Sequence, residues 1–137
     1  MNGAIQFSEA RDLSLQSVES LYRSVKWSSA NKPDQLHRAL LNAHRLVTAW
    51  DDGRLVGLGY AISDGALVVY FPHLVVHPEY QRQGIGAAIM QRLMAHYEGF
   101  HQQSIIADAA SVSFYERLGF VRAGRTEPMW IYDGHEH

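Results

Sequence analysis

The sequence predicts an α/β (α+β) fold whose mixed, mostly antiparallel sheet has six or seven strands, two of them parallel. Three apolar segments, 46–50, 55–62 and 67–76, are separated by Asp51-Asp52-Gly53 and Ser63-Asp64-Gly65. Both separators are hairpin turn signals, so these strands should run antiparallel. A strand, a glycine-containing loop, a helix and another strand follow, and a β-α-β unit of this kind requires parallel pairing.

Length and composition indicate one domain over residues 1–137. The 137 residues are 47% apolar and 19% charged, which is enough for a single hydrophobic core. The longest uncharged run, 65–76, is far shorter than the ~20 residues of a membrane-spanning helix, and the first fifteen residues lack a signal-peptide pattern. The chain has no cysteine, which excludes disulfides and thiolate chemistry. From the lack of cysteine and of a signal-peptide pattern we expect a cytoplasmic protein with no membrane partner, and the net charge of −2 argues against a nucleic-acid partner.

The elements before the sheet follow from capping signals and apolar spacing. Residues 4–7 form a short first strand, and Asp12 or Ser14 can cap the amphipathic helix that follows. Pro33 suits the first turn of a second helix. That helix has apolar residues at helical spacing at Leu36, Ala39, Leu40 and Ala43. Pro72 cannot donate to a strand ladder, so we expect a bulge or a break near it.

The second half of the chain should complete the sheet. The expected elements are a helix over 84–98, a strand over 104–108, a helix over 111–118, and final strands over 120–124 and 129–132. The strand over 104–108 should run parallel to the one that ends at Val76. Gly119 should close the last helix, and residues 126–128 should form the final turn.

The loop before the 84–98 helix is the strongest functional signal. Gly84 and Gly86 let the backbone approach a ligand where the first helical N–H groups have no partner, which favours an anion such as a phosphate. A P-loop would continue with Lys-Ser or Lys-Thr, but Ala87 and Ala88 follow here. A dinucleotide fingerprint would need a glycine in place of Ile89, and it remains the runner-up.

Two segments resemble the GNAT superfamily of acyl-CoA-dependent N-acyltransferases. Gln81-Arg82-Gln83-Gly84-Ile85-Gly86 resembles its Gln/Arg-x-x-Gly-x-Gly/Ala signature. Residues 107–120, Ala-Asp-Ala-Ala-Ser-Val-Ser-Phe-Tyr-Glu-Arg-Leu-Gly-Phe, are similar to its block of Asn, Tyr and Glu-Lys-x-Gly-Phe. The resemblance is close over 67–121. It implies helices on both faces of the sheet and a central parallel strand pair that splays around acetyl-CoA.

The resemblance also implies roles for individual residues. The pantetheine would bind the strand that ends at Val76, and the pyrophosphate would bind the glycine loop. The implied cofactor-binding residues are Leu74, Val75, Val76, Gln81, Arg82, Gln83, Gly84, Ile85, Gly86, Ala87, Asp108 and Tyr115. Tyr115 matches the position that commonly protonates the leaving thiolate. Asp108 stands where the family often has Asn.

Acyl transfer from a thioester to an amine also needs a neutral amine. His73 is the titratable side chain on the strand that should carry the thioester, so it is the candidate base, with a structural histidine as the alternative. As a metal-binding pair, His73 and His77 lack carboxylate or thiolate company, and we predict no metal site.

The resemblance places the acceptor between the first two helices and the C-terminal strands. The candidate residues there are Tyr22, Trp27 and Trp130, with Met129 and Tyr132 beside them. Aromatic walls indicate a small primary amine with an aromatic or apolar body. Residues 21–40 are also similar to the N-terminal part of plant plastid-type arylalkylamine N-acetyltransferases. The alternatives are a catalytically silent acyl-CoA-binding regulator and a small NAD(P)-binding oxidoreductase; the protein should be a monomer or homodimer.

Overall fold

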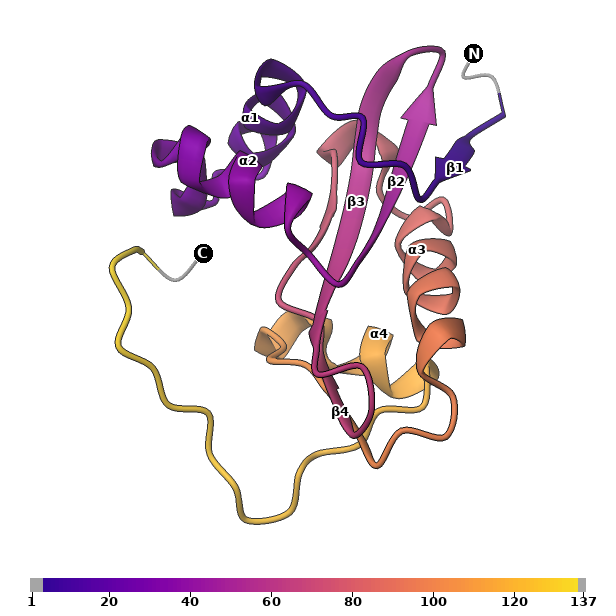
Figure 1. Cartoon of the computed structure of the whole chain (residues 1–137), viewed down its shortest axis with the longest axis vertical. Helices are drawn as coiled ribbons and strands as arrows, with labels where there is room; N and C mark the ends of the chain where they lie inside the picture. Colours follow the sequence, from indigo (N-terminus) through magenta and orange to yellow (C-terminus); the bar gives the residue numbers. More distant parts are fainter. Residues whose placement is uncertain (1–3, 136–137) are drawn as a thin grey trace.

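The sheet is built around β3 (Arg54–Ser63), its longest strand (Figure 1). The computed structural model describes residues 4–135. The strand order is β1-β2-β3-β4-β6, and β5 also pairs with β3. The other strands are β1 (Gln6–Ser8), β2 (Arg45–Asp51), β4 (Val68–Tyr70), β5 (Leu74–Val76) and β6 (Gln102–Ser104). The six strands confirm the predicted size of the sheet.

Helices cover both faces of the sheet, as expected (Figure 1). On one face lie α1 (Leu15–Ser24), the 3-10 turn η1 (Ser28–Asn31) and α2 (Pro33–Leu41); α3 (Ile85–Met94) covers the other face, and α4 (Val112–Arg117) follows β6. Ser14 caps α1 through its side-chain oxygen, which accepts a hydrogen bond from the Ser17 N–H at 3.0 Å. Within residues 4–135 no helix is long and apolar enough to cross a membrane.

Neighbouring residues of the central strands serve two separate cores. Leu46 and Leu55 belong to the core under α1 and α2, whereas Val47 and Val56 belong to the core under α3. This alternation follows from the opposite directions of successive side chains on a strand. A β-carbon at Gly59 would come within 2.8 Å of Ile89 Cγ2, so α3 lies directly on β3.

Pro72 breaks the third antiparallel strand, as predicted. The expected strand over 67–76 becomes β4 and β5, and both pair antiparallel with β3. The predicted parallel pairing is confirmed: β6 pairs with β4, which is the part of the predicted 67–76 strand upstream of the break. The Phe71 N–H donates to the Ser104 carbonyl at 3.1 Å, and β6 ends there instead of running to Asp108. Beyond this point β5 and the chain after β6 diverge.

The two predicted turns take different forms. Asp52 (φ 49°) and Gly53 (φ 84°) make a two-residue hairpin turn, with Asp51 opposite Arg54. The second connection is longer, because β3 ends at Ser63 and β4 begins at Val68. Oδ1 of Asp64 accepts three backbone N–H groups there, and these bonds lower the pKa of Asp64.

The predicted strands over 120–124 and 129–132 are wrong. Residues 120–135, the C-terminal arm, form no strand and bow away from the body before they return beside α2 (Figure 1). The turn lies at 123–126, where the Thr126 N–H donates to the Ala123 carbonyl at 3.2 Å, and not at 126–128. Strand propensity acts only when a neighbouring strand is available. The parallel pair therefore lies at the end of the sheet and not at its centre.

Candidate functional site

One edge of β5 is left free where the chain diverges from it. The Tyr60 N–H donates to the His73 carbonyl at 3.3 Å, and the His77 N–H donates to the Val56 carbonyl at 2.8 Å. Residues 73, 75 and 77 therefore direct their backbone N–H and C=O groups toward β3. In an antiparallel ladder the intervening residues, Leu74 and Val76, turn theirs the opposite way. No strand of residues 4–135 pairs with that edge.

A cavity of about 420 Å³ lies along this edge, and we call it the edge cavity. Its lining residues are Ser24, Val25, Lys26, Trp27, Leu74, Val75, Val76, Pro78, Gln81 and Ser111. The Gln81 side chain donates from Nε2 to the Val76 carbonyl at 2.9 Å, which ties the loop to the strand. The structure thus brings four of the predicted cofactor-binding residues to one cavity.

The glycine loop places free N–H groups at the start of α3. Gly84 precedes α3 with φ 83°, Arg82 also has a left-handed φ of 64°, and the first turn carries no acidic residue. The first bond of the helix runs from the Ala88 N–H to the Gly84 carbonyl at 3.0 Å, so the N–H groups of residues 85–87 have no intrahelical partner. Positive φ explains the glycine at position 84.

Gly86 has a different reason to be glycine. A β-carbon there would lie 3.5 Å from Phe114 Cζ and 3.6 Å from Leu74 Cδ2, which are ordinary contact distances. Packing therefore does not require glycine at this helical position. The space that a side chain would take lies between α4 and the free edge of β5, and a phosphate chain could approach the backbone there.

His73 sits in an aromatic cage next to the break in the strand. Its Nδ1 lies 2.8 Å from the Tyr22 hydroxyl. The rings of Tyr22, Trp27 and Tyr60 have their centroids 5.2 to 5.4 Å from that of His73. Burial raises the pKa of Tyr22 well above its usual value and that of Tyr60 to about 12. Both phenols are therefore hydrogen-bond donors at neutral pH.

A second cavity, of about 390 Å³, opens beside His73, and we call it the aromatic cavity. It is lined by Trp27, Ser28, Ser29, Lys32, Gln35, Leu36, Ala39, Tyr60, Tyr70, Pro72, His73, Ile106, Trp130, Tyr132 and Asp133. Its two oppositely charged residues pair with each other, since Lys32 Nζ lies 2.6 Å from Asp133 Oδ2. Trp27 lines both cavities, so they meet at this side chain.

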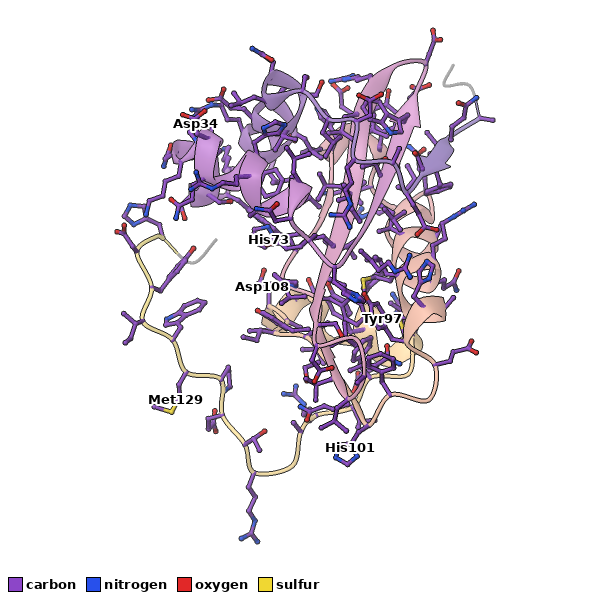
Figure 2. The ribbon with its side chains drawn as sticks, viewed as in Figure 1. Asp34, His73, Tyr97, His101, Asp108 and Met129 are labelled. Atoms are coloured by element: carbon purple, nitrogen blue, oxygen red, sulfur yellow. The ribbon has the colours of Figure 1, made fainter. Side chains whose placement is uncertain are left out.

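Tyr115 lies on α4, outside the lining of either cavity. Its half-buried ring packs edge-on against Phe114 and Phe120 at centroid distances of 5.0 and 5.9 Å. Burial, and then the charge of Asp108, raises the pKa of Tyr115 to about 12. Asp108 is exposed just before α4, on the side of the sheet that faces the C-terminal arm, as is His73 (Figure 2).

The remaining predicted residues are not all placed together. Trp27 and Trp130 line the aromatic cavity, but Tyr22 is fully buried and reaches it only through His73. Met129 is 91% exposed and lines neither cavity. Among residues 4–135 no group of three or more His, Asp or Glu side chains could hold a metal ion.

Sequence reasoning missed Tyr60 and Tyr70, which line the aromatic cavity. Tyr60 could have been found from the antiparallel register, because its N–H bonds to the carbonyl of His73. Tyr70 is next to the break at Pro72, and its contribution depends on where that break falls.

Comparison with known proteins identifies the family. The family model described as an acetyltransferase (GNAT) domain matches residues 9–129. A Prochlorococcus marinus protein named uncharacterized N-acetyltransferase ycf52-like is 29% identical over 121 residues, covering 83% of this chain and 66% of the relative. The Arabidopsis thaliana GCN5-related N-acetyltransferase 3, chloroplastic, is 33% identical over 124 residues, covering 90% and 48%. The chain thus spans about two thirds of the first relative and about half of the second.

Solved structures show the same fold. A GNAT family acetyltransferase from Streptococcus pneumoniae superposes with a TM-score of 0.82 at 28% identity, covering 94% of this chain and 98% of that one. An aminoglycoside N-acetyltransferase solved in complex with CoA superposes with a TM-score of 0.68 at 15% identity, covering 95% and 94%, a likeness of fold alone. Since the family model matches most of the residues, this chain belongs to the GNAT acetyltransferase family.

Proposed function

We propose that the protein transfers an acetyl group from acetyl-CoA to the primary amine of a small molecule with an aromatic or apolar body. The observation that carries the proposal is the meeting of two cavities at Trp27, one along the free edge of β5 and one beside His73. The edge cavity suits the thioester arm, and the aromatic cavity suits the amine. A two-substrate transfer needs both to reach one point.

The residues along β5 and the loop fit the cosubstrate. Leu74 offers a backbone N–H and C=O, and Val76 offers a backbone N–H, on an open edge, as an amide-containing arm requires. The Val76 carbonyl already accepts from Gln81. The free N–H groups at the start of α3 suit a pyrophosphate, with Arg82 and Gln83 in the same loop. Asp108 is the weakest member of the set, because a carboxylate repels phosphate and cannot donate as the family's usual Asn can.

His73 is the proposed base, and Tyr115 is the proposed acid. His73 faces the aromatic cavity, where an amine must lose a proton before it attacks. A backbone N–H of the β5 edge could donate to the carbonyl oxygen as it gains charge. Tyr115 keeps its proton at neutral pH and could pass it to the departing sulfur from α4. A pKa of about 12 makes this phenol a weak acid, so its contribution should be modest.

The lining of the aromatic cavity supports the choice of acceptor. Trp27, Trp130 and Pro72 provide apolar walls. The Lys32–Asp133 pair leaves no unpaired carboxylate among the lining residues to attract a second ammonium group. A monoamine with a ring should therefore be preferred to a diamine.

An amine panel tests this proposal. Acetyl-CoA would be supplied with 2-phenylethylamine, tryptamine, putrescine or an α-amino-blocked lysine, and released CoA thiol would be measured. We expect kcat/KM for the arylalkylamines to exceed that for putrescine by about tenfold or more. Trp27→Ala should reduce this preference, whereas Trp50→Phe, at a tryptophan packed against the core under α1 and α2, should preserve it.

The same experiment separates the remaining alternative. Tight binding of acetyl-CoA without turnover on any amine would favour the silent acyl-CoA-binding regulator, and absence of acetyl-CoA binding would overturn the proposal. Family membership removes the nicotinamide-dependent oxidoreductase. The cytoplasmic location stays a prediction, because the Arabidopsis relative is named chloroplastic.

A further inference from the structure

Several polar side chains that line the aromatic cavity are already engaged. The hydroxyls of Ser28 and Tyr132 lie 3.1 Å apart, which is within hydrogen-bond distance. The Asp133 carboxylate is held in its ion pair at 2.6 Å. The hydroxyl oxygen of Ser29 is buried. These four side chains are therefore committed to other contacts or to the interior, and a bound amine needs a different acceptor.

Tyr60 brings such an acceptor to the cavity. Its ring belongs to the core under α1 and α2, and the residue is only 7% exposed, yet it lines the aromatic cavity. Within the described range 4–135 its hydroxyl has no hydrogen-bond partner. A buried phenol usually has one. A ligand in the cavity is therefore the natural partner of the Tyr60 hydroxyl.

The position of Tyr60 is fixed relative to the proposed base, His73. The Tyr60 N–H donates to the His73 carbonyl at 3.3 Å, and the two rings pack edge-on with their centroids 5.3 Å apart. Burial, and then the neighbouring Tyr70 phenol, raises the pKa of Tyr60 to about 12, so the phenol is neutral at physiological pH. A neutral phenol oxygen accepts hydrogen bonds as well as donating them. Tyr60 and His73 can thus serve the same nitrogen.

The chemistry of the transfer leaves one N–H group in need of an acceptor. A primary ammonium group has three hydrogens, of which one is lost before the nitrogen attacks the thioester carbon and one is lost when the amide forms. The third hydrogen stays on the nitrogen throughout. While the new C–N bond forms, the nitrogen becomes positively charged, and its N–H groups become stronger donors. An acceptor for the retained N–H therefore stabilises the transition state more than the bound neutral amine.

We infer that the Tyr60 hydroxyl accepts a hydrogen bond from the N–H that the acceptor nitrogen keeps throughout the reaction, and that Tyr60 thereby selects primary over secondary amines. The inference rests on the proposed function. In an N-methyl amine a methyl group takes the place of the retained N–H. The methyl group cannot donate, so the phenol oxygen would stay without a partner in a buried site.

A matched pair of acceptors, 2-phenylethylamine and N-methyl-2-phenylethylamine, tests this role. We would measure kcat/KM for both amines with the parent, Tyr60→Phe and Tyr70→Phe. Comparing the primary-to-secondary ratio between proteins cancels the intrinsic reactivities of the two amines. Tyr60→Phe should lower kcat/KM for the primary amine by about tenfold or more and leave that for the secondary amine nearly unchanged. Tyr70→Phe removes the same atom from β4, on the other side of the Pro72 break, and should keep the parent's ratio.

Thermal melting at neutral pH separates substrate contact from packing. Because the Tyr60 hydroxyl has no partner in the described part of the chain, Tyr60→Phe should keep the melting temperature of the parent. A Tyr60→Phe protein with the parent's ratio, with equal losses for the two amines, or without a stable fold would assign the hydroxyl to the structure and overturn the inference. A parent that acetylates no amine would instead remove the proposed function on which the inference rests.

Discussion

The Tyr22 hydroxyl and the Nδ1 atom of His73 are hydrogen-bonded at 2.8 Å. Tyr22 is fully buried, and burial raises its pKa well above the usual value. Among residues 4–135 its hydroxyl has no other hydrogen-bond acceptor, so it donates to Nδ1 of the neutral imidazole. The ring hydrogen of the resting His73 is then on Nε2. For Nε2 to accept a proton, the Tyr22 hydroxyl must rotate and accept from Nδ1–H.

This pairing predicts that Tyr22 acts on catalysis only through His73. Tyr22→Phe keeps the buried ring but removes the oxygen that must accept from Nδ1–H when Nε2 takes up a proton, so turnover should fall by about tenfold. In a His73→Ala background the same change should have no further effect, because its partner is gone. Turnover of the four proteins with one good acceptor measures this coupling. If the effects of Tyr22→Phe and His73→Ala on turnover were additive in the double variant, the pairing would be contradicted.

His73→Ala should also change the pH dependence of the reaction. As the base, His73 works only in its neutral form, so the rate of the parent should fall on the acidic side. The variant should lose that acidic limb as well as rate at neutral pH. The check is kcat/KM for the amine between pH 5 and 9. Identical profiles would make His73 a structural member of the aromatic cage.

Tyr115→Phe should lower turnover while leaving acetyl-CoA affinity nearly intact. The change removes one oxygen from a ring that packs against Phe114 and Phe120, so the fold should be kept. General acid catalysis is worth ~10²–10⁴-fold, and the raised pKa of about 12 places Tyr115 at or below the lower limit. Steady-state turnover and CoA titration separate the possibilities. Turnover within twofold of the parent would assign the side chain to packing.

Two glycine variants should separate cosubstrate binding from folding. Gly86→Val places a branched side chain beside Phe114 and Leu74, so the KM for acetyl-CoA should rise on the order of tenfold. Gly86→Ala, which the family signature accepts and which places a β-carbon at ordinary contact distances, is the control and should keep both the KM and the melting temperature. Gly84→Ala should also destabilise the protein by about 1 kcal/mol, because position 84 has φ 83°. Unchanged KM in a folded Gly86→Val protein would remove this helix start from the site.

Buried phenols should make stability fall at high pH. Burial raises the pKa of Tyr60 and Tyr115 to about 12, while in the unfolded chain both ionise near ~10. Their stabilisation is complete below pH ~10 and is lost as the pH rises toward 12, because the unfolded state loses its protons first. In urea titrations the free energy of unfolding should fall less steeply with pH for Tyr60→Phe than for the parent, by up to about 1.4 kcal/mol per pH unit. Equal slopes would contradict the assigned burial effect.

Local signals in the sequence predicted most of the framework. The Ser14 cap, Pro33 at the start of α2, the Asp52-Gly53 turn and the break at Pro72 each depend on a few neighbouring residues, and all are confirmed. The glycine loop before α3 belongs to the same class, because its backbone geometry is set within five residues.

Features that depend on distant pairing were not predicted correctly. Residues 129–132 have strand composition, but whether they form a strand depends on a neighbour that the sequence does not specify. The parallel pairing of β6 with the predicted 67–76 strand is confirmed, but its position in the sheet was not predicted, because the expected strands beyond β6 do not form and the pair lies at the end of the sheet. The cage around His73 joins α1, the residue before η1, and β3. The sequence therefore indicated Tyr22 and Trp27 singly, but it did not indicate Tyr60 or the cage as a group.

Trp27 stands between the edge cavity and the aromatic cavity. A ligand in one cavity that fixes the Trp27 indole in one rotamer changes the volume of the other cavity. The two substrates therefore need not bind independently. Thermodynamic linkage then requires that acetyl-CoA changes the affinity for the amine by the same factor as the amine changes that for acetyl-CoA. The side chain that separates the substrates would also be the natural fluorescent reporter of the order in which they arrive.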